Sequence, residues 1–361
     1  MKNHFENSGN QLPNHPVKGI VTWRSPSNIA FIKYWGKYGV QLPKNASLSM
    51  TLSAAYTETT IQYQTTSTKP KREFLFEGKV NTDFSERIWK YIDTLGELFP
   101  FLEKVDLIIN SKNSFPHSAG IASSASAMSA LALCLTDIEK ALFNHLSIKQ
   151  DFLKKASYVA RLGSGSAARS VYGGYTIWGQ SGLDYIKTNN EFATDINENI
   201  HPYFQQLRDA ILIIDDGEKK VSSSLGHSLM NNHPYADERL TQANKHIIEI
   251  TDALVKGKKK EFIKIVESEA LSLHALMLSS DPWFVLMKPH TLTILEKIKA
   301  YRESTGIFIT FTLDAGPNVH LIYHKQDEIA INQFIENELK SFCKQQQVIF
   351  DELGKGPQKI T

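Results

Sequence analysis

The chain has few of the features that would place it in several protein classes. Cys134 and Cys343 are the only cysteines in 361 residues, so neither a disulfide framework nor a cysteine-based metal site is expected. The first 16 residues are polar and lack the apolar core of a secretory signal. The longest apolar stretch, at 127–135, is too short to span a bilayer. With 42% apolar and 22% charged residues, a soluble, cytoplasmic globular protein is predicted.

Acidic residues are missing from three long windows. No Asp or Glu occurs at 7–57, 107–136 or 152–183, although each window contains loops rich in Ser and Gly. A site for a highly anionic ligand needs cations and free N–H groups without competing carboxylates. The windows therefore favour an anion-binding site, although chance and lysines lying along apolar surface would give a similar pattern. The net charge of only +2 argues against a nucleic-acid partner.

The patterning predicts two domains after a leader at 1–19. Residues 20–195 alternate strands and helices: strands are expected at 21–26, 31–35, 47–64, 73–78 and 105–110, and helices at 83–99, 123–142 and 150–163. Residues 196–361 predict the order β-α-α-β-β-α-β, which is typical of a small α+β sandwich with helices on one face of an antiparallel sheet. We find no internal repeat.

The loop between the strand at 105–110 and the helix at 123–142 is the clearest candidate for phosphate binding. Gly120 permits close backbone approach, and Ser123 and Ser124 fall at the expected helix start, where free N–H groups and the helix dipole favour an anion. An ordinary helix cap on a tightly packed small-residue helix would look the same. The loop is neither a Walker A motif nor a G-x-G-x-x-G fingerprint.

Three further segments combine charge with unusual surroundings. Ser164, Ser166 and Arg169 lie in a Gly-rich stretch that offers hydroxyls and a bidentate guanidinium, or simply a turn with a surface arginine. Asp314 ends an apolar strand before Ala-Gly-Pro-Asn and is either a general base or a plain Asx turn. Lys33 and Lys37 interrupt an apolar run, and strand spacing would place both on one face.

Taken together, these segments resemble the diphosphomevalonate decarboxylase family of the GHMP kinase superfamily. The resemblance is carried by SPSNIAFIKYWGK, LPKNASLSMTL, FPHSAGIASSASA, RLGSGSAARSVYGG, VSSSLGHSL and FTLDAGPN, which follow one another in family order. It implies a two-domain GHMP kinase fold of the α+β class, with an N-terminal mixed α/β domain that binds ATP and a C-terminal ferredoxin-like sandwich. It also implies ATP- and Mg²⁺-dependent decarboxylation of mevalonate 5-diphosphate to isopentenyl diphosphate, with release of ADP, phosphate and CO₂.

The family's functional residues map onto single positions of this chain. The resemblance implies that Asp314, Lys33 and Arg169 are catalytic, with Asp314 as the essential carboxylate and Arg169 on the carboxylate that leaves. The implied substrate-binding residues are Tyr34, Trp35, Gly36, Lys37, Ser164, Gly165, Ser166, Ala167, Ala168, Arg169 and Ser223. The implied ATP-binding residues are Pro116, Gly120, Ile121, Ala122, Ser123, Ser124 and Ala125. No metal ligands are implied, and a homodimer is a further expectation.

The chain departs from the family pattern at three places. Ser224 stands where many bacterial members have Arg, His227 replaces a usual Met, and Arg72 lies one residue before the expected Arg position, which Glu73 occupies. The alternative activities for this chain are decarboxylation of mevalonate 5-phosphate and a mevalonate-type kinase reaction without decarboxylation. A non-catalytic nucleotide-binding protein on the same fold is opposed by the joint presence of Lys33, Arg169 and Asp314.

Overall fold

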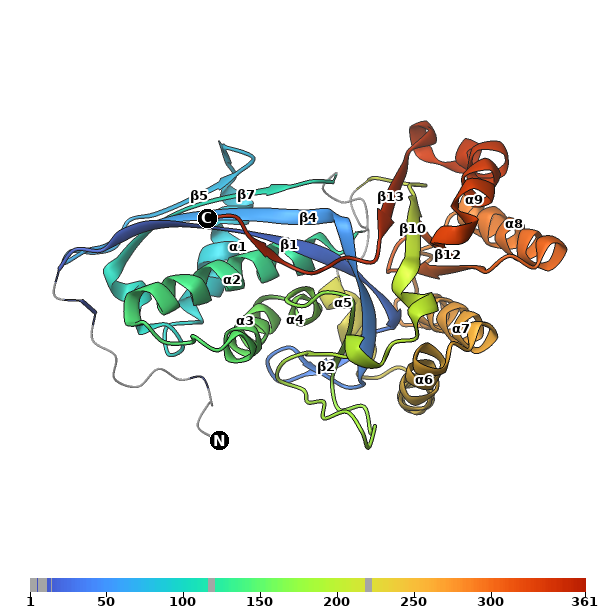
Figure 1. Ribbon diagram of the computed structural model, residues 1–361, viewed down its shortest axis with the longest axis horizontal. Helices are drawn as coiled ribbons and strands as arrows, with labels where there is room; N and C mark the ends of the chain where they lie inside the picture. The colour runs from blue at the N-terminus through green and yellow to red at the C-terminus, as the bar shows by residue number, and fades with distance from the viewer. Residues whose placement is uncertain (1–4, 6–11, 14, 116–120, 218–222) are drawn as a thin grey trace.

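The computed structural model describes residues 5, 12–13, 15–115, 121–217 and 223–361. They form two main sheets with helices packed against them, and a separate two-stranded sheet (Figure 1). The large sheet has the order β14-β1-β4-β7-β5-β6, and β8 and β9 continue from one half of β4. Its strands are β1 (Lys18–Ile32), β4 (Ser47–Thr65), β5 (Arg72–Phe76), β6 (Lys79–Val80), β7 (Val105–Asn113), β8 (Tyr175–Trp178), β9 (Thr194–Asp195) and β14 (Gln358–Lys359).

The antiparallel pair of β1 and β4 is the backbone of the large sheet. Its register runs from Lys18 opposite Gln64 to Ile32 opposite Leu48, with irregularities at 26–28 and 30–32. Pro26 lies at the first of these, where a missing N–H is tolerated. The two strands expected at 21–26 and 31–35 are therefore one strand that ends at Ile32, and the expected leader residues 18 and 19 already belong to it.

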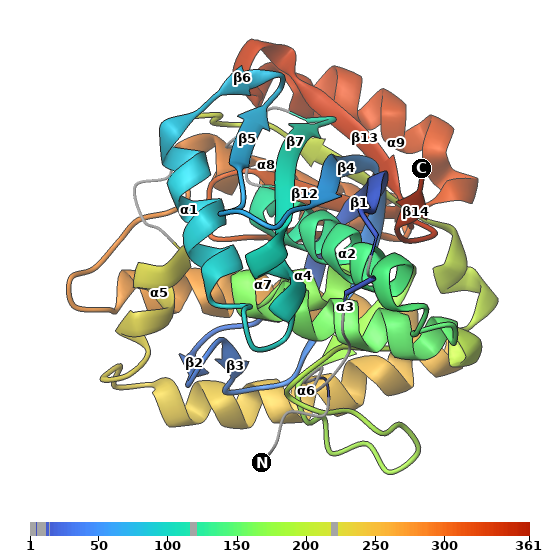
Figure 2. The same cartoon turned by 90° about the vertical axis from the view of Figure 1, so that its left-hand side faces the viewer.

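Helices cover one face of the large sheet. α2 (Ser123–Phe143), α3 (Lys149–Gly163) and the short α4 (Ala167–Ser170) pack together beneath β1 and β4, and α1 (Thr82–Asp93) packs against β5 (Figures 1 and 2). α2 is buried around most of its circumference, which its run of Ala, Ser and Leu allows. The helix expected at 83–99 ends at Asp93, and a turn follows.

The smaller sheet has the order β11-β12-β10-β13, with every neighbouring pair antiparallel. Its strands are β10 (Leu207–Leu212), β11 (Ile309–Leu313), β12 (Val319–His324) and β13 (Val348–Glu352). In chain order this is strand 4-1-3-2, the arrangement of a ferredoxin-like sheet, which confirms the expected fold class. The helices of this half are α5 (Ser223–Leu229), α6 (Ala236–Lys256), α7 (Lys259–Leu278), α8 (Pro289–Thr305) and α9 (Glu328–Phe334).

The sequence-based order lacked α8. The helix begins with Pro at its first turn and buries Ile294, Leu295 and Ile298, a helical spacing that the sequence contains. It packs on β11 beside α7, which also contacts that strand. Two helices therefore pack against β11. This packing fixes the strand end from which the turn at Asp314 begins.

The two sheets share one core. Ile29 and Phe31 of β1 pack with Ile250 of α6 and Phe262 of α7. After β13 the chain returns to the large sheet, where β14 pairs with the edge of β1 (Figure 1). The small hairpin of β2 (Lys37–Tyr38) and β3 (Leu42–Pro43) follows the end of β1 and lies beside α5 (Figure 2). This shared core places the ends of β1 and β11 close together.

Candidate active site

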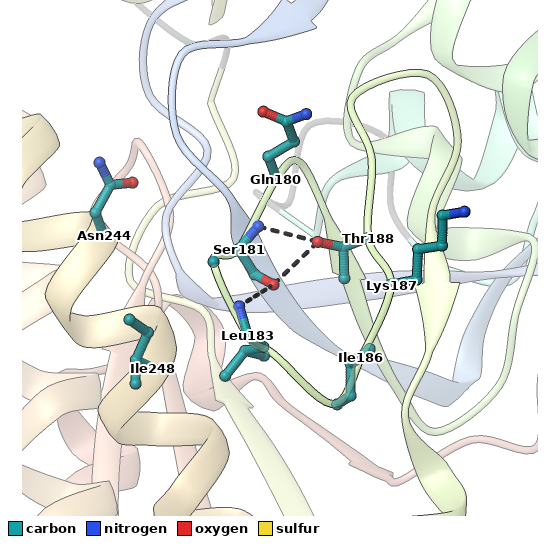
Figure 3. Close-up of a pocket in the computed structure, with 9 residues that line it drawn as sticks. Gln180, Ser181, Leu183, Ile186, Lys187, Thr188, Asn244 and Ile248 are labelled. Atoms are coloured by element: carbon teal, nitrogen blue, oxygen red, sulfur yellow. Dashed lines mark hydrogen bonds between the residues drawn. The ribbon is translucent and has the colours of Figure 1, made fainter.

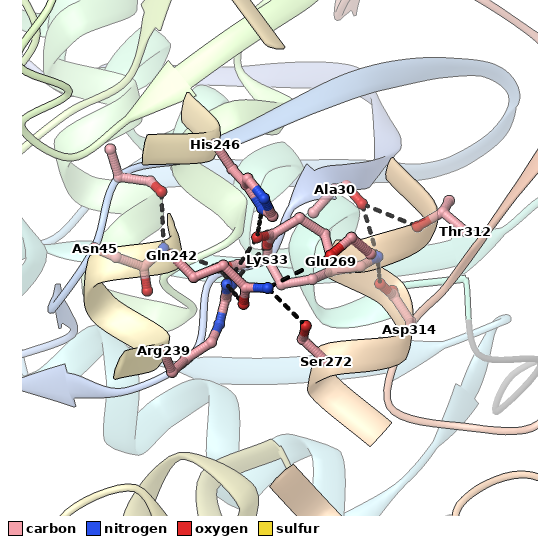
Figure 4. Close-up of polar contacts among 12 residues, drawn as sticks. Ala30, Lys33, Asn45, Arg239, Gln242, His246, Glu269, Ser272, Thr312 and Asp314 are labelled. Atoms are coloured by element: carbon pink, nitrogen blue, oxygen red, sulfur yellow. Dashed lines mark hydrogen bonds and ion pairs between the residues drawn. The ribbon is translucent and has the colours of Figure 1, made fainter. Parts of the chain in front are cut away.

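Lys33 and Asp314 meet where the two sheets join. Lys33 follows the last residue of β1, Asp314 follows the last residue of β11, and Lys33 Nζ lies 3.3 Å from Asp314 Oδ1 (Figure 4). Lys33 Nζ also donates to the Ala30 carbonyl at 2.7 Å. The lysine side chain is 2% exposed and the aspartate 27%, so the carboxylate faces the exterior and the ammonium lies behind it. Burial lowers the pKa of Lys33, while Asp314 and Glu269 oppose that shift.

The turn that carries Asp314 is fixed by its main chain. The Asp314 carbonyl accepts from the Gly316 N–H at 2.7 Å and from His274 Nε2 of α7 at 3.2 Å. Burial lowers the pKa of His274 to about 4, so the ring is neutral near pH 7 and its Nε2 carries the proton that it donates. These two bonds hold the turn through the main-chain carbonyl of Asp314.

Arg169 lies in α4 and is held by oxygen atoms of uncharged side chains. Its Nε donates to Asn28 Oδ1 at 3.3 Å and to Ser49 Oγ at 3.0 Å, and one terminal nitrogen donates to Ser47 Oγ at 2.5 Å. Burial lowers the pKa of Arg169 to about 10, with Asp314 opposing the shift, so the side chain stays charged at neutral pH. Within the described residues it has no carboxylate partner within 4.0 Å. A buried guanidinium without such a partner can accept the carboxylate of a ligand.

The hydroxyls of the predicted Ser-Gly-Ser segment face the start of α2. Ser164 Oγ lies 3.4 Å from both Ser124 Oγ and Ser166 Oγ. Asn28 Nδ2 donates to the Ser166 carbonyl at 3.2 Å and so ties this segment to the residue that holds Arg169. Ala167 and Ala168 are buried beneath it. The structure therefore brings the proposed substrate segment next to the proposed ATP-binding helix.

Gly165 is required by close packing. A Cβ atom at this position would lie 2.8 Å from ring atoms of both Trp178 and Tyr34. Tyr34 in turn packs against the ring of His227, with ring centroids 4.3 Å apart. The Tyr34 hydroxyl and the Trp35 indole N–H are buried, and neither has a hydrogen-bond partner in the part of the chain that the structure describes. Such atoms commonly bind water or a ligand.

Lys33 and Lys37 do not share a strand face, contrary to the prediction. The chain leaves regular structure after Ile32, and Gly36 adopts a φ of +89° before Lys37 begins β2. Lys37 Nζ donates to Gln41 Oε1 at 3.2 Å rather than toward Asp314. Burial lowers the pKa of Lys37. A turn at glycine, which the strand-spacing argument ignored, explains the error.

The predicted ATP-binding segment is described in part. Ile121 and Ala125 are buried, Ala122 precedes α2 in the left-handed region, and Ser123 and Ser124 form its first turn. The Ile121 carbonyl accepts from Ser27 of β1 at 2.6 Å, which fixes the entry to the helix. Pro116 and Gly120 lie outside the described residues. Ser223 is the first residue of α5.

Two family models cover most of the chain. The diphosphomevalonate decarboxylase-like N-terminal domain matches residues 25–189, and the mevalonate 5-diphosphate decarboxylase C-terminal domain matches residues 210–360. The chain belongs to the diphosphomevalonate decarboxylase family. Both matches include the residues described above, since the first contains Lys33 and Arg169 and the second contains Asp314.

Individual relatives agree with this membership. The diphosphomevalonate decarboxylase of Debaryomyces hansenii is 27% identical over 84% of this chain and 79% of its own length, and that of Danio rerio is 28% identical over 88% and 78%. The mevalonate diphosphate decarboxylase of Staphylococcus aureus is 29% identical, with a TM-score of 0.82 over 96% of this chain and 99% of its own. MDDEF in complex with MVAPP, AMPPCP and magnesium gives a TM-score of 0.80 and 28% identity over 95% and 99%.

Two departures from the family pattern have a clear structural setting. His227 of α5 packs between Tyr34 and Trp35, and its Nδ1 accepts the Gly36 N–H at 3.0 Å. Arg72 contacts Asp93 at 2.5 Å and so is occupied by an ion pair at the end of α1. The first departure packs against two residues that are predicted to bind substrate, whereas the second is engaged in an ion pair beside the large sheet.

A cavity of about 590 Å³ lies elsewhere, between α6 and the loop at 180–188 (Figure 3). Gln180, Ser181, Lys187, Thr188, Asn244 and Ile248 are among its lining residues, and none of the predicted site residues lines it. Ser181 and Thr188 hydrogen-bond to each other across the loop at 2.9 Å. The predicted catalytic residues Lys33, Arg169 and Asp314 therefore lie outside this cavity.

The residues that hydrogen-bond to Arg169 and to the Lys33 main chain were not predicted from the sequence. Asn28, Ser47 and Ser49 bind Arg169, while Glu269 and Arg239 bind the main chain at Lys33. Asn28 could have been found, because it is an amide directly before a buried apolar run at 29–32. The other four gave no local signal, since each acts through a partner more than 100 positions away in the chain.

Proposed function

We propose that this chain catalyses the ATP-dependent decarboxylation of mevalonate 5-diphosphate to isopentenyl diphosphate, with release of ADP, phosphate and CO₂. The observation that carries the proposal is the buried Lys33 ammonium against Asp314, with the charged Arg169 guanidinium nearby, in a member of this family. Relatives support the substrates: MDDEF forms a complex with MVAPP, AMPPCP and magnesium, and ATP binding by the Enterococcus faecalis enzyme is described as mevalonate diphosphate mediated.

Asp314 and Lys33 act on the 3-hydroxyl group. Asp314 accepts its proton, because this carboxylate is the more exposed partner of the pair. Lys33 Nζ lies behind it and stabilises negative charge that develops on the oxygen. Lys33 performs this role while protonated, and its two neighbouring carboxylates, Asp314 and Glu269, favour that state.

Arg169 holds the carboxylate that leaves. Its hydrogen bonds to Asn28, Ser47 and Ser49 orient the guanidinium without neutralising it. Ser164, Gly165 and Ser166 line the approach to it, and Tyr34 and Lys37 bind the phosphate end of the substrate. Buried polar atoms on Tyr34 and Trp35 fit a polar ligand at this place.

The residues present fit ATP and Mg²⁺. Ser123 and Ser124 begin a 21-residue helix whose first turn has no acidic residue, which suits the phosphates. No group of three His, Cys, Asp or Glu residues that could hold a metal occurs among the described residues. This suits an Mg²⁺ that arrives with the phosphates and needs only one or two carboxylates. When bound, ATP supplies the phosphoryl group that turns the tertiary 3-hydroxyl into a leaving group, and Mg²⁺ neutralises phosphate charge.

A release assay distinguishes this function from its alternatives. Mevalonate, mevalonate 5-phosphate and mevalonate 5-diphosphate are supplied separately with ATP and Mg²⁺, and ADP and CO₂ are both measured. We expect equal amounts of ADP and CO₂ with the diphosphate and little with the other two. Preference for the monophosphate identifies the sister decarboxylase, and ADP without CO₂ identifies a kinase; either result contradicts the proposal.

Location and assembly remain predictions. We propose a cytoplasmic enzyme that can form a homodimer and has no nucleic-acid partner. In the described ranges no helix is long and apolar enough to cross a membrane.

A further inference from the structure

A buried ionic cluster joins α6, α7 and the end of β1. Both terminal nitrogens of Arg239 on α6 donate to Glu269 on α7, at 2.7 and 2.6 Å, and His246 Nδ1 lies 2.7 Å from the same carboxylate (Figure 4). The Glu269 side chain is fully buried and that of Arg239 is 2% exposed. Burial alone would raise the pKa of Glu269, but hydrogen bonds from His246 and Arg239, with the charge of Arg239, hold it at about 2.

The cluster binds the main chain of Lys33. Glu269 Oε2 accepts the Lys33 N–H at 3.0 Å, and Arg239 donates to the Lys33 carbonyl at 3.4 Å. Asn45 Nδ2 donates to the same carbonyl at 2.9 Å. The ladder between β1 and β4 stops one residue earlier, at Ile32. Side chains therefore satisfy the buried peptide groups of Lys33 that would otherwise lack partners.

We propose that Glu269 and Arg239 are positioning residues for the phosphoryl-transfer step, and that they hold the Lys33 main chain so that its Nζ meets Asp314. The inference rests on the proposed function, in which Lys33 and Asp314 act on the 3-hydroxyl group. Glu269 and Arg239 do not touch the substrate in this proposal. They act through Lys33, whose side chain has only one other described hydrogen bond, to Ala30.

A purely structural ion pair between two helices would not need these contacts. Lys155 of α3 and Glu139 of α2 form such a pair beneath the large sheet, with 2.6 Å between Nζ and Oε1 and both side chains buried. This pair does not contact Lys33 or Asp314. Well-packed apolar residues can replace a buried pair of that kind without loss of stability. They could not replace the acceptor and the donor that Glu269 and Arg239 present to the Lys33 peptide groups.

The cluster also sets the charge around Lys33. The ionisable groups that act on Lys33 are Asp314, Glu269, Arg169, His274 and His320, and Arg239 touches its carbonyl. Asp314 and Glu269 favour the protonated lysine, whereas Arg169 disfavours it. Removing the charge of Glu269 lowers the pKa of Lys33 further. Because the protonated lysine is the active form, the alkaline limb of the rate profile then moves to lower pH.

The first test compares Glu269→Gln with Glu139→Gln. Gln keeps the size of Glu269, but its NH₂ group faces either Arg239 or the Lys33 N–H, both of which are donors. We expect kcat to fall by about 10²-fold, the scale of a misplaced catalytic group, with KM values near wild type and the alkaline limb at lower pH. Glu139→Gln breaks a buried pair of the same kind and should leave kcat and the pH profile unchanged. A folded Glu269→Gln variant whose kcat and pH profile both match wild type overturns the proposal.

A double variant separates positioning from stability. Glu269→Met combined with Arg239→Met removes both charges together and keeps apolar packing between α6 and α7. We expect a folded protein whose kcat stays as low as that of Glu269→Gln. Recovery of wild-type kcat in the double variant would contradict the inference, because packing alone would then suffice.

A spectroscopic readout keeps this inference distinct from the proposed function. The pKa of Lys33 is followed by NMR of ¹³C-ε-labelled lysine, with Lys33→Arg to assign its signal. We expect a lower pKa in Glu269→Gln than in wild type, and an unchanged pKa contradicts the role of Glu269. An inactive wild type instead contradicts the proposed function, whatever the titration shows.

Discussion

The Arg169 guanidinium is held in place by hydrogen bonds and yet has no described carboxylate partner, so it can still bind an anionic group. Its hydrogen bonds go to Asn28, Ser47 and Ser49, all uncharged, and burial lowers its pKa only to about 10. The guanidinium thus keeps its charge and its planar geometry, as the proposed binding of the substrate carboxylate requires. The role depends on geometry more than on charge.

Replacing Arg169 by Lys separates these two contributions. Lysine keeps the charge but loses the fork and at least one of the bonds to Asn28, Ser47 and Ser49. We expect kcat/KM for mevalonate 5-diphosphate to fall by an amount equivalent to about 1–3 kcal/mol. Steady-state kinetics with varied substrate measure this, and a variant equal to wild type would show that bidentate binding is not required.

His227 makes stability depend on pH. Burial, with Lys37 nearby, lowers its pKa to about 3, below the value of about 6.5 in an unfolded chain. Between these values the unfolded state binds more protons, so this residue destabilises the fold as pH falls below about 6.5. In His227→Met we expect the decline of unfolding free energy to be shallower, by up to about 1.4 kcal/mol per pH unit. Urea unfolding at pH 7.5, 6 and 5 tests this, and parallel pH dependences would contradict it.

The segment between α3 and α4 is an element whose backbone has to pass close to two aromatic rings. A Cβ at Gly165 would lie 2.8 Å from Trp178 and from Tyr34, which are large and held in place. In Gly165→Ala we therefore expect the segment to shift away from the rings and move Ser164 and Ser166. The KM for the diphosphate should rise about 10-fold with little loss of stability; unchanged kinetics would show that the segment does not bind substrate.

Long, strongly periodic elements could be predicted from the sequence, and special backbone geometry could not. The two successive helices that the order for residues 196–361 predicts before its second strand are present as α6 and α7. The end of β1 was missed, because FIKYW has strand composition whereas its peptide groups are bound by Glu269 and Arg239 from far along the chain. Lys33, Asp314 and Arg169 were singled out by their isolation in apolar or acid-poor segments, but their supporting residues act only through tertiary contacts.

The carboxylate of Asp351 also joins the two halves of the molecule, in addition to the shared core and the contacts at Lys33. Asp351 of β13 accepts the N–H groups of Ser53, Ala54 and Ala55 of β4, at 2.7 to 2.8 Å. These bonds satisfy three donors where β4 bends away from its partner strand. The same junction supports the meeting of β1 and β11, and therefore the site itself.

Replacing Asp351 by Ala leaves those donors without an acceptor. We expect the free energy of unfolding to fall by about 2–4 kcal/mol, the scale of losing several charge-assisted bonds in a largely buried place. Denaturant unfolding followed by fluorescence measures this, with Asp106→Ala as a control, because its only described hydrogen bond is the exposed one to the Lys71 N–H. A loss equal to that of the control would show that the junction does not depend on Asp351.

Because Lys33 comes from the large sheet and Asp314 from the small one, their ion pair exists only in the whole folded chain. The most direct test of this account is turnover and binding in Asp314→Asn. Asn keeps the size of the side chain, and the turn is held by main-chain bonds, but the base and its charge are lost. We expect turnover to fall by about 10²- to 10⁴-fold. Calorimetry with a non-hydrolysable ATP analogue should show retained affinity for mevalonate 5-diphosphate, whereas near-normal turnover in the folded variant would contradict the account.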